Sequence, residues 1–272
     1  MISPTDHRTP AFTLIELIVV MAIIAALTVF CIPAFTNLRG ANELTNAAYA
    51  IKGVLEQART YAQVNNTYAW VGFFEESGTI ASTNPPTPGN GRLVISTVAS
   101  ADGTTIYGSA PGAIDPVRLI QVGRLMKVDN LHLPLFTIGT GTGDAFDSRP
   151  ALQSEPTAGF NYSRFGELNA APPNTAPHTN SQYPFQYPVG DPAPPPQYTF
   201  VKTLQFSPRA ESRINGNNYD VRRIVEIGLL PTRGGALPPA SNGAGTSGAS
   251  YDGNVVAIQI SGFGGMVKLY RR

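Results

Sequence analysis

An apolar run, "TPAFTLIELIVVMAIIAALTVFCIPAF" (residues 9–35), dominates the N-terminal part of this 272-residue chain. Between Phe12 and Phe35 it holds a single carboxylate, Glu16, and no basic residue. As a helix these residues extend about 36 Å, which exceeds the roughly 30 Å hydrocarbon core of a bilayer. The sequence therefore predicts a membrane-spanning helix over residues 12–35, with one charge near its start that needs an explanation.

Glu16 is costly in such a helix. A carboxylate costs about 2.5 to 3.5 kcal/mol at the centre of a membrane-spanning helix and less near its end, so Glu16 should have a partner or a role. The alternative is an acid that is tolerated near the interface of a simple membrane anchor. A secretory signal peptide is a poor match, because the small residue Ala11 precedes the apolar run instead of following it.

Ala11, Phe12, the sequence "TLIEL" and Pro33 together resemble the N-terminus of type IV prepilins and of type II secretion pseudopilins. The resemblance implies that a leader, residues 1–11, is removed before Phe12 and that Phe12 is then N-methylated. It also implies that Glu16 serves assembly and that Pro33 weakens the helix. This chain has Ala11 where the family usually has glycine before the cut.

The chemistry of these residues supports an assembly role. Leader removal would expose an α-amino group at Phe12, four residues before Glu16. In a staggered stack of helices, the amine of one subunit can meet the carboxylate of its neighbour, and the two charges neutralise each other. Pro33 removes a backbone donor and crowds the preceding turn, so we expect the helix to bend or weaken there, unless it marks a simple kink near the membrane exit.

Beyond Pro33, apolar residues recur at steps of three and four and predict an amphipathic helix within residues 36–66. The predicted buried stripe is Leu44, Ala48, Ile51, Leu55, Ala58 and Ala62. Asn65 and Asn66 give a stop signal, so helix is predicted over 12–64. Hydrophobicity alone permits two helices, and one continuous helix is what the resemblance implies.

Residues 67–272 consist of short β-branched and aromatic runs separated by Gly, Asn and Pro, which predicts an antiparallel sheet. The runs cover residues 67–74, 92–98, 117–128, 202–207, 222–230, 254–260 and 265–271. The sequence "SGFGG" (261–265) predicts a hairpin between the last two runs. The expected fold class is α+β and pilin-like: a long N-terminal helix, transmembrane in its first half, packed on one β-rich domain.

Two segments interrupt the predicted strands. Residues 137–200 hold eleven of the 24 prolines, and residues 231–253 are rich in Gly, Ala and Ser. Both are predicted to be insertions or long loops, because proline favours extended chain and cannot donate to a sheet. Several aromatic side chains can tether the first segment to the domain: Phe160, Tyr162, Phe165, Tyr183, Phe185 and Tyr187. A surface loop and a recognition surface are both compatible with this composition.

The β-rich half is similar to H-type minor pseudopilins and to their FimT-like pilin relatives, in the segments "ARTYAQVNN", "YAWVGFF", "LQFSPRAE" and "VVAIQISGFGGMVKLYRR". The last segment is also similar to the prepilin-like group called Verru_Chthon cassette protein D. The resemblance implies a minor subunit of a type II secretion pseudopilus or a type IV pilus. It implies a single-pass protein of the bacterial inner membrane, with a cytoplasmic leader and a periplasmic domain. The implied partners are other pilin or pseudopilin subunits, a prepilin peptidase/methyltransferase and an inner-membrane assembly platform.

Composition argues against several other functions, although the fold can still create a local basic patch. Lys and Arg total 19 against 18 Asp and Glu, without long runs, so no nucleic-acid partner is predicted. Cys31 is the single cysteine and excludes an internal disulfide. The histidines, His7, His132 and His178, are far apart, so neither a metal cluster nor a catalytic triad is predicted and the chain is not expected to be an enzyme.

No cofactor is predicted, and calcium is the one ion with any candidate ligands. Asp144 and Asp147, in the Gly-rich "GTGTGDAFD" (139–147), can offer oxygen atoms, but their spacing does not match an EF-hand loop. The main alternative function is an extracytoplasmic ligand-binding protein in which residues 12–35 are a plain membrane anchor.

Overall fold

The structure of the chain is a computed structural model. It describes residues 13–105, 112–140, 143, 145–154, 162–167, 169, 180–190, 195–214, 221–241, 248–251 and 253–272, and of residues 29–41 the backbone only. The chain divides into two compact units, Met1–Glu43 and Leu44–Arg272.

One helix, α1, covers Leu14–Val64. Its end agrees with the prediction, while Phe12, where the predicted helix began, lies outside the described residues. Asn66 stops the helix by adopting a left-handed conformation, with a φ of 48°. The following amide, Thr67 N–H, donates to the Ala62 carbonyl oxygen over 2.9 Å, which satisfies a free carbonyl of the last turn.

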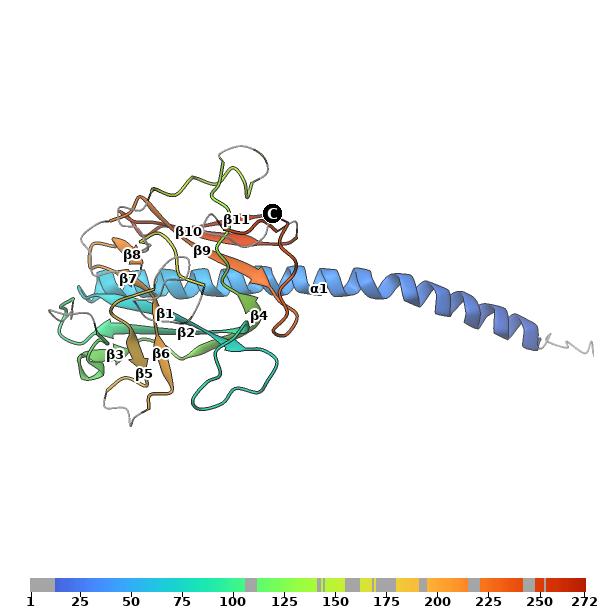
Figure 1. Ribbon diagram of the computed structural model, residues 1–272, viewed down its shortest axis with the longest axis horizontal. Helices are drawn as coiled ribbons and strands as arrows, with labels where there is room; N and C mark the ends of the chain where they lie inside the picture. The colour runs from blue at the N-terminus through green and yellow to red at the C-terminus, as the bar shows by residue number, and fades with distance from the viewer. Residues whose placement is uncertain are drawn as a thin grey trace, which may run out of the picture. The chain divides into compact units, whose positions relative to one another are not determined.

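The second part of α1 packs on the sheet through the predicted stripe. The side chains at all six predicted positions are 2% exposed or less: Leu44, Ala48, Ile51, Leu55, Ala58 and Ala62. They share one hydrophobic core with sheet residues such as Phe73, Leu204 and Ile258. Within Leu44–Arg272 the helix therefore covers one face of the sheet (Figure 1), which confirms the α+β, pilin-like arrangement.

The large sheet is antiparallel, and its strands follow the order β11-β10-β9-β4-β2-β1-β7-β8, with β3 beside β2. Its strands are β1 (Ala69–Ser77), β2 (Gly91–Ser100), β3 (Leu119–Gln121), β4 (Met126–His132), β7 (Lys202–Phe206), β8 (Ser212–Ile214), β9 (Ile224–Pro231), β10 (Val256–Ser261) and β11 (Val267–Arg271). A second sheet pairs β5 (Phe185–Tyr187) with β6 (Tyr198–Phe200), and a 3-10 helix, η1, covers Pro116–Arg118. The predicted β10–β11 hairpin is confirmed.

Two details of the strand prediction were wrong. The run 117–128 forms two strands, because the chain turns at Gly123, whose φ of 83° is left-handed. The short strands β5, β6 and β8 were not predicted. The described parts of residues 231–253 end β9 and then form turns and isolated bridges, such as Phe136 with Ala249.

The face of the sheet opposite α1 is also buried. Trp70 and Phe74 of β1 lie there in a second hydrophobic cluster, together with aromatic residues of the proline-rich segment. Tyr183 and Phe185 are buried in this cluster, and Phe165 is buried in the core on the helix side. The predicted aromatic tether is confirmed for these three residues, while Phe160 lies outside the described residues.

Gly72 makes this packing possible. A Cβ atom at Gly72 would lie 2.5 Å from Phe185 Cζ and 2.6 Å from Phe200 Cβ. We therefore predict that Gly72→Ala lowers the free energy of unfolding by about 1 to 3 kcal/mol, the usual cost of overpacking a core. Urea unfolding of the full chain measures this change.

Gly53→Ala is the matched control. Gly53 lies inside α1, and a Cβ atom added there would have no neighbouring atom within 4 Å, so alanine should stabilise the helix by about 0.5 to 1 kcal/mol. Equal effects of the two substitutions would contradict the close packing of Phe185 on β1.

Two buried carboxylates connect the loops to the sheet. Glu226 of β9 accepts a hydrogen bond from Arg149 Nε over 2.8 Å and one from Arg164 Nη2 over 3.2 Å. Both arginines come from the proline-rich segment, and the guanidinium of Arg149 also stacks on the Phe146 ring at 4.1 Å. Arg149 is fully buried, so this ion pair holds the segment against the outer face of β9.

Glu75 of β1 forms the second buried cluster. Its carboxylate accepts hydrogen bonds from Lys202 Nζ and from the Leu133 amide, and it lies 2.7 Å from His132 Nδ1. Burial opposes ionisation of Glu75, but the charges of Lys202 and His132 and their hydrogen bonds outweigh it and lower the pKa of Glu75 to about 2.

This pKa makes stability depend on pH. Because the folded-state pKa of Glu75 lies below its ordinary value of 4.5, the ionised group stabilises the fold above about pH 4.5, and the contribution is lost as the pH falls towards 2. The loss amounts to about 3 kcal/mol. We predict that Glu75→Gln lowers the free energy of unfolding at pH 7. It should also flatten the acid limb of the curve of stability against pH, as measured by urea unfolding at each pH.

Glu56→Gln is the control for this titration, because Glu56 is exposed on α1. It should leave the acid limb as steep as in the unmodified protein. A Glu75→Gln profile that runs parallel to the unmodified one would contradict the role of the Glu75 charge.

Candidate assembly site at the N-terminal segment

Glu16 lies at the start of α1 and is held by Thr13. Its Oε2 accepts a hydrogen bond from the Thr13 amide over 2.9 Å and another from the Thr13 hydroxyl over 2.8 Å. In return, the Thr13 hydroxyl accepts from the Glu16 amide over 3.3 Å. This reciprocal pattern is a capping box, in which a threonine before the helix and a glutamate three residues later satisfy free amide groups of the first turn.

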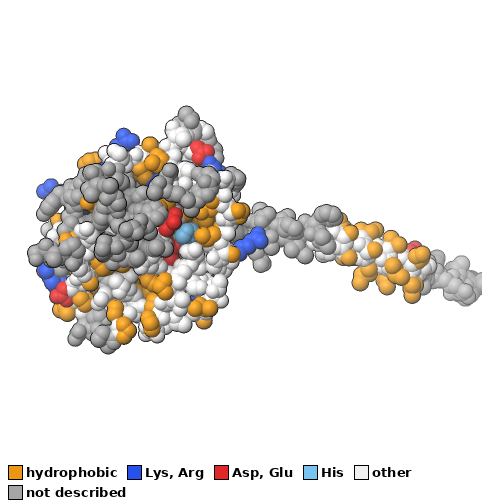
Figure 2. Space-filling view, in the orientation of Figure 1, with side chains coloured by type: hydrophobic (Ala, Val, Ile, Leu, Met, Phe, Trp, Pro, Cys, Tyr) orange, Lys and Arg blue, Asp and Glu red, His pale blue; other side chains and the backbone are white. Residues whose placement is uncertain are grey.

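The next turns of α1 present apolar side chains in every direction. Large apolar residues between Leu14 and Leu27 are 47 to 77% exposed within the chain, including Ile15, Leu17 and Met21. Figure 2 shows hydrophobic side chains along both visible sides of this described stretch. A helix that is apolar on all sides needs a surrounding apolar phase or other helices to cover it. Glu16 is therefore a charge at the start of an apolar surface that such a phase or such helices must cover.

The structure tests only part of the predicted site. Ala11 and Phe12 lie outside the described residues, so their cleavage and methylation and the pairing of Phe12 with Glu16 remain predictions. The backbone of Pro33 lies within α1, and its side chain is outside the described residues.

A membrane-spanning helix was predicted over residues 12–35. Among the residues that the structure describes, no helix combines the length and the apolar character needed to cross a membrane. Phe12 and the side chains of residues 29–35 lie outside the described residues.

Of the two calcium candidates, only Asp147 lies within the described residues. Asp147 accepts a hydrogen bond from Arg272 Nη2, which engages its carboxylate, and Asp144 lies outside the described residues. No group of three or more His, Cys, Asp or Glu side chains in the described ranges is placed to hold a metal ion.

Comparison with known proteins identifies the N-terminal segment. Residues 7–32 match the family model described as "Prokaryotic N-terminal methylation motif". No curated protein and no solved structure matches the chain. The chain thus carries a prepilin-type methylation motif at the start of an α+β, pilin-like fold, and the two together suggest a subunit of the type IV pilin and pseudopilin kind.

Thr13 is the residue of this site that the sequence reasoning missed. The signal was present, because Thr13 and Glu16 have the spacing of a capping box directly before an apolar run. Glu16 stands out in the sequence by its charge, whereas Thr13 is marked only by its position three residues before Glu16.

We predict that Thr13→Ala loosens the start of α1. Loss of a threonine cap should speed amide exchange at residues 14–17 about fivefold, as measured by hydrogen exchange of the full chain in detergent micelles. Thr28→Ala is the control, because the Thr28 hydroxyl donates to the carbonyl oxygens of Ile24 and Ala25 and caps no amide. Unchanged exchange at residues 14–17 in Thr13→Ala would contradict the cap.

Proposed function

We propose that this chain is a minor, pilin-like structural subunit of a type II secretion pseudopilus or a type IV pilus. In this proposal the leader is cut after Ala11, Phe12 is N-methylated, and the mature protein enters the fibre through α1. The observation that carries the proposal is the prepilin-type motif at residues 7–32, which leads into an apolar helix with one carboxylate at its start.

Glu16 is the assembly contact in this mechanism. In the single chain its carboxylate is satisfied by Thr13 of the same helix. On assembly the N-methylated amine at Phe12 of a neighbouring subunit approaches the carboxylate, and the apolar helices bury each other. A charge surrounded by apolar side chains needs an opposite charge beside it. This contact therefore selects one axial register between subunits.

A structural role agrees with the rest of the chain. We assign no chemical step to the protein, and the energy for assembly comes from a cytoplasmic ATPase acting through the inner-membrane platform, as the resemblance to pseudopilins implies. The long proline-rich segment 137–200 favours a minor subunit, because a more compact domain is easier to repeat along a fibre.

Substitution of Glu16 tests this proposal. We predict that Glu16→Ala and Glu16→Gln each lower the amount of the protein in sheared fibres by about tenfold or more relative to the unmodified protein, because the incoming amine loses its charged partner. The measurement is immunoblotting of the fibre and membrane fractions in cells that express the matching assembly system.

Glu43→Gln is the matched control, because Glu43 is an exposed glutamate on the same helix and should leave incorporation unchanged. Full incorporation of Glu16→Ala would contradict the assembly role and would favour a plain membrane anchor for a ligand-binding domain.

A further inference from the structure

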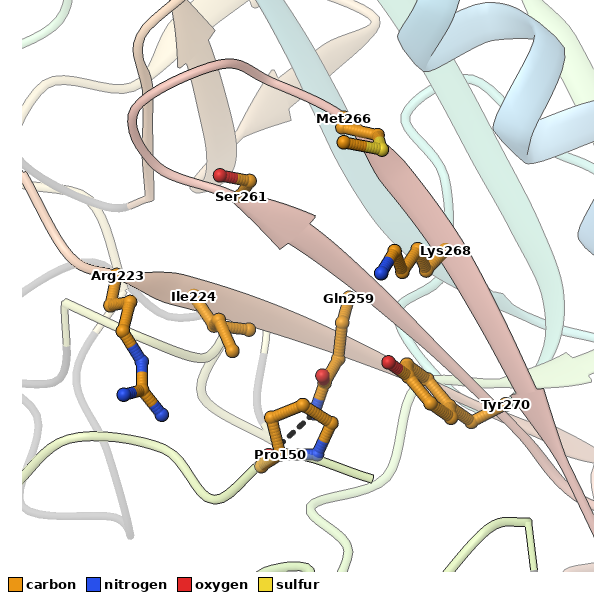
Figure 3. A pocket seen from close by; sticks show the side chains of 8 residues that line it. All are labelled: Pro150, Arg223, Ile224, Gln259, Ser261, Met266, Lys268 and Tyr270. Carbon is orange, nitrogen blue, oxygen red and sulfur yellow. Dashed lines mark hydrogen bonds between the residues drawn. The ribbon is translucent and has the colours of Figure 1, made fainter. Parts of the chain in front are cut away.

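An open groove lies on the outer face of β9, β10 and β11. Gln259 and Lys268 line the groove, while their strand neighbours Ile258 and Leu269 pack towards α1. Because successive side chains of a strand point to opposite faces, the groove is on the face opposite the helix. It has a volume of about 340 Å³. In Figure 3 the side chains of Lys268 and Tyr270 stand beside Gln259, while Pro150 lies below Gln259 and accepts a hydrogen bond from it.

The strand next to this groove has a free edge. In the described part of the chain β11 pairs only with β10. The Arg272 N–H donates to the Val255 oxygen, and the Ser261 N–H donates to the Met266 oxygen. These two bonds show which opposed residue pairs of the β10–β11 ladder are hydrogen-bonded. Because bonded and non-bonded pairs alternate in an antiparallel ladder, Val267, Leu269 and Arg271 direct their amide and carbonyl groups away from β10. These groups are positioned to receive a further strand.

The charge around the groove indicates which strand can bind. Lys268 and Arg223 are exposed there, and none of the eight lining residues is acidic. Lysine on an edge strand is a common means of preventing a protein from pairing with its own copies, because like charges then meet across the new ladder. The same charges attract an acidic strand, so this edge rejects a second copy of the chain and accepts an acidic partner.

We infer that the outer edge of β11, with the groove beside it, binds an extended acidic segment of a partner protein as an additional strand. Main-chain hydrogen bonds to Val267, Leu269 and Arg271 align the segment. Its acidic side chains lie on the groove face next to Lys268, and its apolar side chains lie on the other face next to Leu269, which already packs on the core. This contact goes beyond assembly through Glu16 and does not depend on it.

A synthetic peptide tests this inference on the full chain in detergent micelles. The probe is a fluorescein-labelled peptide of sequence EVEVEVE, which carries glutamates on one face and valines on the other. We expect it to bind, as followed by fluorescence anisotropy, and we expect Lys268→Glu to weaken binding about tenfold. Arg124→Glu is the matched control, because Arg124 is an exposed basic residue between β3 and β4, outside the groove, and it should leave binding unchanged.

Two further measurements separate strand addition from simple charge attraction. The same peptide methylated on every backbone nitrogen keeps its charges but cannot donate hydrogen bonds, so it should bind at least about tenfold more weakly. Bound EVEVEVE should also slow amide exchange at Val267, Leu269 and Arg271 while leaving Lys268 and Tyr270 unchanged, because the latter two already donate to β10.

Three results would overturn the inference: no binding of EVEVEVE, equal binding of the methylated peptide, or equal binding of a single-stranded oligonucleotide of the same charge. The last result would identify the groove as a general site for polyanions. Glu16→Ala should bind the peptide as tightly as the unmodified protein, so failure of the assembly proposal and failure of this one remain distinguishable.

Discussion

At β1 and β2 the large sheet is buried on both faces, and this constraint governs the globular unit. Neighbouring residues of β1 show it, because Trp70 and Val71 point to opposite faces and both are almost completely buried. A sheet of this kind needs a layer on each side. The stripe of α1 supplies one layer, and aromatic residues such as Phe185 and Phe200 supply the other. The proline-rich segment is therefore part of the core and not only a surface decoration.

A segment rich in proline has few ways to hold such a position. It cannot donate regularly to a sheet ladder, so contacts of side chains must fix it. Here they are aromatic packing and the buried ion pairs of Arg149 and Arg164 with Glu226. Replacing a buried ion pair by apolar residues is often neutral, whereas removing one partner is costly. We interpret these pairs as devices that select one position for the loops more than as a source of net stability.

The sequence predicted those parts of the fold that depend on local periodicity. The α1 stripe follows helical spacing over five turns, and the long strands are marked by β-branched and aromatic runs. Strands β5, β6 and β8 have three residues each, which is too short for alternation to show. The partners of Glu226 could not be predicted either, because Arg149 lies 77 positions away in the sequence and only the fold brings the two together. At the candidate assembly site, Glu16 is predictable because a charge stands out in an apolar run, whereas its partner Thr13 is marked only by the spacing of a capping box.

The N-terminal segment differs from the sheet, because its described apolar side chains are exposed in the single chain. Its single carboxylate has a local partner in Thr13. In the assembly that we propose, processing adds a second partner, the amine of a neighbouring subunit. Only the contact with a neighbour's amine depends on a cut directly before Phe12. Mass spectrometry of the N-terminus of the protein, purified from cells with an active prepilin peptidase, tests this most directly. An N-methylated Phe12 is the predicted result, and a mature chain that still begins at Met1 would contradict it.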